Sequence, residues 1–160
     1  MKVKIKLIQR EGVPEVFPMP VKGSGGAACY DVFATHIQFK ENDKVKVSLG
    51  FATEIPEGYK GCVVPRSSFT QKGWIMQNSP AQIDSDYRGE WMLKFQAISD
   101  DAKTSLDGHL VDVLFPDFPY KVGDRVAQIY FEKVLNPELV VVHSLDETTR
   151  GEGGFGSTGK

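Results

Sequence analysis

The chain has 160 residues, a formal net charge of −2, 41% hydrophobic residues and 25% charged residues. This is the composition of one globular domain with a substantial core, and the near-neutral charge argues against general binding to nucleic acid. No apolar run is long enough to cross a bilayer, and the N-terminus alternates charged and apolar residues instead of forming a secretion signal. We therefore expect a cytoplasmic protein, or one in the host cytoplasm if its source is viral, with no membrane partner.

Short apolar runs separated by turn residues predict β-strands along most of the chain. The expected strands lie at 3–7, 37–39, 45–49, 51–55, 59–64, 74–76, 91–97, 109–115, 125–131 and 139–142. No segment has sustained helical periodicity. Regular short strands with turns between them indicate an all-β sandwich or distorted barrel with little helix.

Three segments before the middle of the chain suggest polar chemistry. Asp31 lies inside the apolar run 27–34, where it needs a partner unless it faces water at a strand end. The glycine cluster at 22–26 lacks the Gly-Lys-Ser/Thr ending of a phosphate loop. Arg66 stands beside Ser67 and Ser68 in a segment that could form one helical turn, with Ser67 as its N-cap. That turn is either a cradle for an anion or a capped surface turn.

The segment 78–90 is the most informative part of the chain. It lies between two apolar runs, which predicts a hairpin or a paired loop, and it carries Asp84, Asp86 and Tyr87. Residues two apart on an extended segment project to the same side, so the two carboxylates should lie together. Two acids and a tyrosine on one loop could activate a water and stack on a ring. A solvated hairpin tip is the alternative.

Two further features lie near the C-terminus. Gln128 falls at an expected core position, so its amide should bond either to backbone or to a ligand. The glycine-rich end 150–160 contains Phe155 and is either a disordered terminus or a flap that closes on a planar, anionic ligand. The two cysteines, Cys29 and Cys62, are expected to be reduced thiols, with one disulfide left open. The scattered histidines and cysteines show no zinc-ligand spacing.

Five segments in order resemble the motifs of the trimeric deoxyuridine triphosphatase (dUTPase) family. They are 28–34 around Asp31, 65–73, 78–90 with Ile83-Asp84-Ser85-Asp86-Tyr87-Arg88-Gly89 at its centre, 123–128, and 150–159. The resemblance implies a jelly-roll-like β fold and a homotrimer whose active sites are composites of neighbouring chains. It also implies Mg²⁺-assisted hydrolysis of dUTP to dUMP and pyrophosphate. That reaction keeps uracil out of DNA and supplies dUMP for thymidylate synthesis.

The resemblance also implies roles for individual residues. Asp84 would activate the water that attacks the α-phosphorus, and Asp31 would bind Mg²⁺ through water. The nucleoside would be held by Asn78, Gln82, Ile83, Asp84, Tyr87 and Met92. The phosphates would be held by Arg66, Ser67, Ser68 and Gln128, of which Arg66 and Gln128 also assist catalysis. The tail residues Arg150, Phe155, Gly156, Ser157 and Thr158 would close over the bound nucleotide.

The same reading divides the chain into a β domain at 1–149 and a mobile flap at 150–160 that closes on a neighbouring site. Residues 99–115 look like an insertion, either a surface hairpin or a contact site for a protein partner. Cys29 and Ala81 replace glycines common in the family, and Pro80 is unexpected beside Ala81. A dCTP deaminase and a nucleotide-sensing binding module are the alternative functions, although the intact 83–87 segment argues against the first.

Overall fold

The computed structural model describes residues 1–10, 19–40, 44–69, 73–98 and 117–153. The elements in chain order are β1 (Lys4–Leu7), β2 (Val21–Lys22), β3 (Tyr30–Phe33), β4 (His36–Lys40), β5 (Lys44–Ser48), β6 (Phe51–Glu54), β7 (Tyr59–Val64), the 3-10 turn η1 (Ser67–Phe69), β8 (Trp74–Met76), β9 (Ala81–Ile83), β10 (Met92–Ala97) and β11 (Arg125–Lys133). The all-β prediction is confirmed. No helix among the described residues is long and apolar enough to span a membrane.

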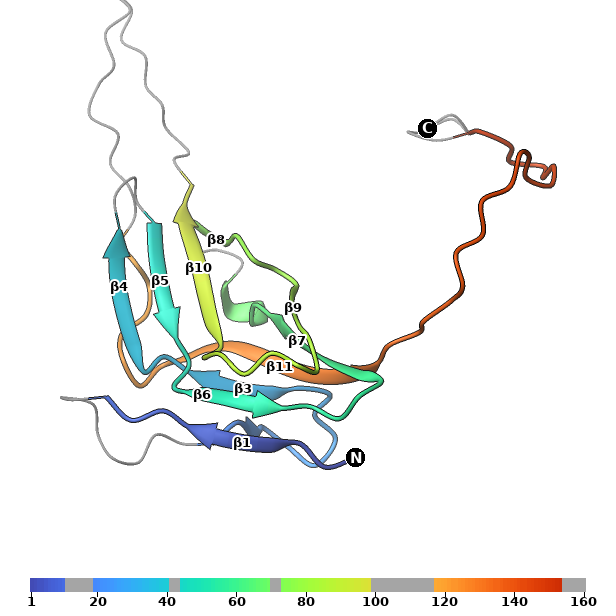
Figure 1. The fold of residues 1–160 in the computed structure, drawn as a ribbon. Helices are drawn as coiled ribbons and strands as arrows, with labels where there is room; N and C mark the ends of the chain where they lie inside the picture. The colour runs from blue at the N-terminus through green and yellow to red at the C-terminus, as the bar shows by residue number, and fades with distance from the viewer. Residues whose placement is uncertain (11–18, 41–43, 70–72, 99–116, 154–160) are drawn as a thin grey trace, which may run out of the picture.

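The strands form two main antiparallel sheets and one small sheet. The order is β4-β5-β10-β8 in one sheet, β2-β3-β11-β7-β9 in another, and β1-β6 in the small one. The strands of the first sheet run across those of the second, and β1 and β6 lie along one side (Figure 1). The chain thus has the sandwich-like arrangement expected from short alternating strands.

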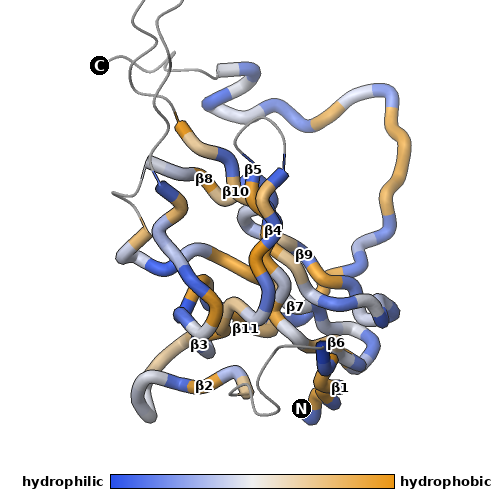
Figure 2. The backbone as a smooth tube through the Cα atoms, turned by 90° about the vertical axis from the view of Figure 1, so that its left-hand side faces the viewer, coloured by the Kyte–Doolittle hydropathy of each residue, from blue (hydrophilic) through white to orange (hydrophobic). Residues whose placement is uncertain are grey.

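The core lies between the two main sheets because each strand buries alternate residues. In β10, Leu93 and Phe95 are fully buried while Lys94 between them is exposed. Trp91, just before β10, donates its indole N–H to Thr53 Oγ1 at 3.1 Å. An added Cβ at Gly61 on β7 would lie 2.4 Å from the Trp91 ring, so glycine is required there. Hydrophobic residues follow the strands through the body (Figure 2).

The prediction of a strand at 139–142 is wrong. This segment belongs to an arm, residues 134–153, that runs away from the body after β11 (Figure 1). Leu139 and Val141 are 91% and 97% exposed. The run has strand-forming residues, but a strand needs a neighbouring backbone to pair with, and the described part of this chain places none beside it. The strand predicted at 109–115 lies outside the described residues.

Candidate active site

The segment 78–90 is built on a hairpin, and one asparagine links its two strands at the point where they diverge. β8 and β10 pair antiparallel, with Met76 opposite Phe95, as the flanking apolar runs predicted. Asn78 donates from Nδ2 to the Met92 carbonyl at 3.1 Å and accepts from the Lys94 N–H at 2.9 Å. Its side chain therefore replaces a backbone partner of β10 where the two strands diverge. One amide hydrogen and one lone pair stay available to a ligand.

The sequence did not predict that β9 leaves this hairpin for the other sheet. β9 pairs with β7, with Ile83 opposite Gly61 and Gln82 opposite Cys62. The hairpin segment therefore bridges the two main sheets. This crossing opens a cavity of about 430 Å³ between β9, β10 and the loop that joins them.

Five of the predicted nucleoside-binding residues line this cavity together. It is bounded by Lys46, Gln82, Ile83, Asp84, Tyr87, Glu90, Trp91, Met92 and Lys94. We call it the nucleoside cavity. It combines an apolar wall with an acid and an aromatic ring at the mouth, and this combination is typical of a site for a planar polar ligand.

Tyr87 is held at the mouth of this cavity by its own loop. Its side chain is 43% exposed, and its hydroxyl donates to the Glu90 carbonyl at 3.2 Å. A Cβ at Gly89 would lie 2.3 Å from the Tyr87 hydroxyl oxygen, so only glycine allows the ring to lie over the loop. The nearly buried carboxylate of Glu90 pairs with Arg10 and accepts from the Gly50 N–H at 3.1 Å. These contacts tie the loop to the body.

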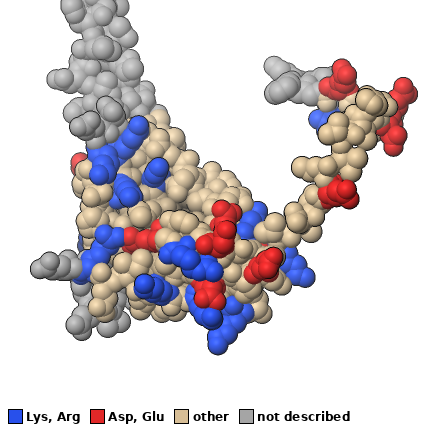
Figure 3. Space-filling view, viewed as in Figure 1, with Lys and Arg blue, Asp and Glu red and all other residues tan. Residues whose placement is uncertain are grey.

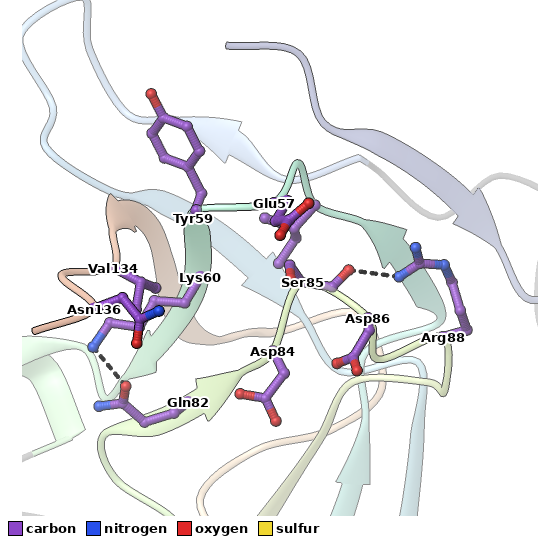
Figure 4. A pocket seen from close by; sticks show the side chains of 12 residues that line it. Glu57, Tyr59, Lys60, Gln82, Asp84, Ser85, Asp86, Arg88, Val134 and Asn136 are labelled. Carbon is purple, nitrogen blue, oxygen red and sulfur yellow. Dashed lines mark hydrogen bonds between the residues drawn. The ribbon is translucent and has the colours of Figure 1, made fainter. Parts of the chain in front are cut away.

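Asp84 and Asp86 project to the same side of their loop, as predicted, while Arg88 turns away to bond the Ser85 carbonyl at 2.7 Å (Figure 4). Both acids also line a larger, open cavity of about 940 Å³ that extends to the base of the arm at Val134 and Asn136. Of the two acids, only Asp84 borders both cavities. A carboxylate in that position reaches solvent on one side and a ligand in the nucleoside cavity on the other.

Lys60 lies on the wall of the larger cavity and links two side chains there. Its ammonium donates to Gln82 Oε1 at 2.7 Å and pairs with Glu132 at 3.0 Å. The hydrogen bond from Lys60 lowers the pKa of Glu132. Gln82 is thus oriented by Lys60, a contact across strands that sequence reading did not anticipate.

Asp31 is buried at the centre of a second polar cluster. It is 5% exposed, with Arg66 Nε 3.3 Å from Oδ1 and Arg125 Nη1 donating to Oδ2 at 3.3 Å. Gln128 donates from Nε2 to Oδ1 at 3.1 Å. The expectation that Asp31 needs a partner is confirmed. Gln128 bonds this carboxylate rather than backbone, because β3 and β11 pair with Asp31 opposite Gln128.

The predicted phosphate-binding residues surround this cluster. Arg66 also donates to the Arg125 carbonyl at 3.2 Å, so its guanidinium is fixed at the end of β7. Ser67 and Ser68 follow in η1, where the Phe69 N–H bonds the Arg66 carbonyl at 2.9 Å. Ser67 thus stands inside the turn rather than at its cap. An anchored arginine followed by two hydroxyls suits phosphate oxygens.

Within one chain, the residues predicted to bind the nucleoside lie far from those predicted to bind the phosphates. Asp84 follows β9, whose register places it beside Lys60 on β7, whereas Arg66 follows the other end of β7. Six residues of extended chain separate these positions, about 20 Å. Within one chain, Asp84 and Arg66 thus lie at opposite ends of β7.

The chemistry of the Asp31 cluster can be tested against the Mg²⁺ that the resemblance implies. No group of three or more His, Cys, Asp or Glu side chains within the described ranges could hold a metal. Mg²⁺ bound to a nucleotide keeps several waters and takes one or two carboxylates together with phosphate oxygens. The oxygens of Asp31 keep lone pairs beyond the three contacts above, so the residue fits a water-mediated role.

The predicted flap is described only in part. Arg150 is exposed and donates from Nε to the Gly153 carbonyl at 2.8 Å. Phe155, Gly156, Ser157 and Thr158 lie outside the described residues, as does the whole of the predicted insertion 99–115. The described part of the arm, residues 134–153, runs away from the body of the same chain (Figure 1).

Comparison with known proteins decides the family. The dUTPase family model matches residues 15–105 and 110–159. This chain belongs to the dUTPase family. A probable deoxyuridine 5'-triphosphate nucleotidohydrolase of Schizosaccharomyces pombe is 39% identical over 142 residues, covering 88% of this chain and 90% of that protein. The nucleotidohydrolase of Fusobacterium nucleatum is 36% identical over 160 residues, covering 99% of both.

Solved dUTPase structures share the fold. The Staphylococcus bacteriophage 80alpha dUTPase with dUPNHPP aligns with a TM-score of 0.75 and 25% identity over 99% of both chains. It is described as controlling transfer of virulence genes. The dUTPase of phage phi11 of S. aureus, described with a structural Mg(II) ion, aligns with a TM-score of 0.65 at 20% identity, covering 90% of this chain and 98% of that one.

Proposed function

We propose that this dUTPase-family chain hydrolyses dUTP to dUMP and pyrophosphate, which limits uracil in DNA and provides dUMP for thymidylate synthesis. The observation that carries the proposal is the nucleoside cavity. Gln82, Ile83, Asp84, Tyr87 and Met92, chosen from the sequence, line one space of about 430 Å³. A deaminase would need a different environment around its catalytic acid.

Asp84 is the residue that activates the attacking water. Its carboxylate is exposed and borders both cavities, so a water bound to it can lie between solvent and the bound nucleotide. The main contribution of this carboxylate is to hold one water in line with the phosphorus. Tyr87 packs on the deoxyribose and excludes a 2′-hydroxyl. Asn78 and the backbone at 82–83 read the uracil edge.

Arg66, Ser67, Ser68 and Gln128 hold the phosphates, and Asp31 orients Arg66 and Gln128 from behind. Asp31 would hold Mg²⁺ through water, and the bound ion would offset part of the charge of the triphosphate. The basic and amide groups of this cluster bind anionic oxygens in the same region. The two positive side chains beside Asp31 make the cluster favourable for a ligand with several negative charges.

We further propose that the protein assembles as a homotrimer with sites shared between copies. The separation of Asp84 from Arg66 along β7 supports this arrangement. The exposed apolar residues of the arm support it as well, since Leu135, Leu139, Val141 and Leu145 are each at least 86% exposed. The arm of one copy would pack on a second and bring Arg150, Phe155, Gly156, Ser157 and Thr158 to its nucleotide.

Pyrophosphate release in the presence of Mg²⁺ tests the activity. The assay compares dUTP with dCTP, dTTP and UTP for the unaltered protein, Asp84→Asn and Asp86→Asn. We expect strong selectivity for dUTP and at least about a hundredfold loss in Asp84→Asn, in the range of a lost general base. Asp86→Asn makes the same charge change two residues away, outside the nucleoside cavity, and should retain most activity.

The alternatives give different outcomes in the same experiment. Release of ammonia from dCTP would identify a deaminase. Binding of dUTP without pyrophosphate release would identify a nucleotide-sensing module. Deletion of 150–160 should leave a folded assembly with badly reduced turnover, because the core strands end before it. Full activity after this deletion would refute the flap.

A further inference from the structure

The carboxylate of Glu90, which borders the nucleoside cavity, is bonded to two distant segments of the chain. Its side chain is 6% exposed, pairs with Arg10, 80 residues away along the chain, and accepts from the Gly50 N–H at 3.1 Å. A nearly buried charge without a partner is costly, so this carboxylate depends on both contacts. Glu90 takes no part in the chemistry proposed for Asp84, so its contacts need another explanation.

The backbone at Glu90 carries the ring of Tyr87. The Tyr87 hydroxyl donates to the Glu90 carbonyl at 3.2 Å, and the ring lies so close to Gly89 that an added Cβ there would be 2.4 Å from the ring Cζ. The Tyr87 side chain is 43% exposed at the cavity mouth. Any shift of the backbone at 89–90 would therefore shift the ring as well.

The side chain of Glu90 gives this backbone a second anchor. The Trp91 N–H bonds the Phe51 carbonyl at 3.0 Å, and that bond can form with any residue at position 90. On the other side, Gly89 lacks a Cβ and has the conformational freedom of glycine, so the chain can turn about this point. The Glu90 carboxylate thus fixes the backbone on the side nearest Tyr87.

Arg10 extends this anchor to the strands that form a wall of the cavity. Its Nη2 lies 3.5 Å from Ser48 Oγ, at the buried end of β5. Ser48 is opposite Met92 of β10, which lines the cavity, whereas Arg10 itself does not. The set of residues that we call the Glu90 clamp consists of Arg10, Ser48, Gly50 and Glu90. The clamp links the loop of Tyr87 to the strand of Met92 and holds the two at a fixed spacing.

We propose that the Glu90 clamp gives the nucleoside cavity its preference for a deoxyribose over a ribose, with Glu90 as a positioning residue that acts through Tyr87. A ribonucleotide adds a 2′-hydroxyl between the sugar and the Tyr87 ring. A ring held at a fixed spacing cannot move aside for this group, whereas a ring on a loose backbone can. This inference rests on the proposed function, in which Tyr87 packs on the sugar.

Substitutions of Arg10 test the clamp without altering the lining of the cavity. The assay compares kcat/KM for dUTP and UTP in the unaltered protein, Arg10→Ala and Arg10→Lys. The shape of a pocket rejects a small added group by about 10–200-fold, so we expect Arg10→Ala to lower the ratio for dUTP over UTP by at least about tenfold. Arg10→Lys keeps the charge and should retain most of the ratio. The preference for dUTP over dCTP should stay unchanged, because Asn78 and the backbone at 82–83 lie outside the clamp.

Glu90→Gln is a milder second variant. Its amide oxygen can still accept from the Gly50 N–H, but it has no charge for Arg10, so we expect a smaller loss of sugar preference. The double variant Glu90→Gln with Arg10→Ala should lose no more than Arg10→Ala alone, because the effects of residues that act as one unit are not additive. Two unrelated losses of stability would add instead.

Lys4→Ala is the matched control, since it removes the basic member of another ion pair in the N-terminal segment. Lys4 pairs with Glu54 at 2.6 Å, but the two side chains are 67% and 49% exposed and lie outside the cavity. Charges of both signs are interspersed over the lower part of the body (Figure 3), and exposed pairs contribute little. Lys4→Ala should therefore leave the ratio for dUTP over UTP unchanged. Circular dichroism at the assay temperature shows whether each variant is folded.

The outcomes separate the inference from the proposed function. If the unaltered protein hydrolyses dUTP, an unchanged ratio for dUTP over UTP in both Arg10→Ala and Glu90→Gln overturns the inference alone, as does an equal loss in Lys4→Ala. An unaltered protein that does not hydrolyse dUTP overturns the proposed function. Calorimetric binding of dUMP and UMP, which needs no turnover, then decides the inference: the preference for dUMP should fall in Arg10→Ala, and an unchanged preference overturns the clamp.

Discussion

Asp31→Asn is the substitution that best tests how the phosphate-binding cluster is organised. Asparagine keeps the shape of the side chain and one acceptor oxygen, so the bond from Gln128 to Oδ1 can persist. The amide nitrogen then faces Arg125, which is half exposed and can turn to water. Arg66 loses its counter-charge as well. It cannot turn to water as easily as Arg125, because its side chain is only 28% exposed and also bonds the Arg125 carbonyl.

The size of the effect follows from these exposures. The contact with Arg66 is a partly buried charged interaction, worth about 1.5–3 kcal/mol. The contact with the half-exposed Arg125 adds at most about 1 kcal/mol, because water screens it. We therefore expect Asp31→Asn to lose about 2–3 kcal/mol of stability, which corresponds to roughly 4–12 °C in Tm for a chain of this size. KM for dUTP should rise because Arg66 is no longer held in place.

Thermal unfolding at one fixed protein concentration measures the stability change, since assembly makes Tm depend on concentration. Asp117→Asn is the matched control: Asp117 is exposed, and only its backbone carbonyl bonds Trp74. It should shift Tm by less than about 2 °C, because surface substitutions usually stay within about 0.5 kcal/mol. An Asp31→Asn protein that melts like the unaltered one would refute the argument that Asp31 organises Arg66.

Three further predictions concern the body of the protein. Gly61→Ala should lower the free energy of unfolding, measured in urea, by at least about 2 kcal/mol. The new methyl group would lie 2.4 Å from the fully buried Trp91 ring, and equal stability would contradict this packing. Iodoacetamide at mildly alkaline pH should modify Cys29 well before Cys62, as followed by mass spectrometry. Cys62 is buried, and burial raises the pKa of its thiol, so less of the reactive thiolate forms at a given pH. Tyr120→Phe should raise Tm by about 2–4 °C, because no residue in the described ranges bonds the buried Tyr120 hydroxyl. A lower Tm would show that this group is satisfied in solution.

The sequence predicted local structure well where strands alternate. The runs at 59–64 and 74–76 match β7 and β8 residue for residue, because apolar periodicity and the turn before Tyr59 are local signals. It also found the acidic loop with Asp84 and Tyr87, whose residues do converge on one cavity. Both cysteines are free, in line with the expected thiols.

Sequence reading missed contacts that depend on strand pairing. The partners of Asp31 are three residues far along the chain, and only the register of β3 against β11 brings Gln128 to it. The same holds for the link from Lys60 to Gln82, which the pairing of β7 with β9 brings about. At 139–142 the sequence predicted an element that the structure lacks, because strand-forming residues do not create a strand without a neighbouring strand to pair with.

The sequence by itself determined the class of fold and the residue types of the site, because alternation, turns and motif spacing act over a few neighbouring residues. Only the tertiary structure decided which of these residues meet. It buried Asp31 between two arginines, gave Asp84 access to both cavities and carried the arm away from its own body. The physical reason is that sheet register sets side-chain neighbours across long stretches of chain, and no local pattern encodes that register.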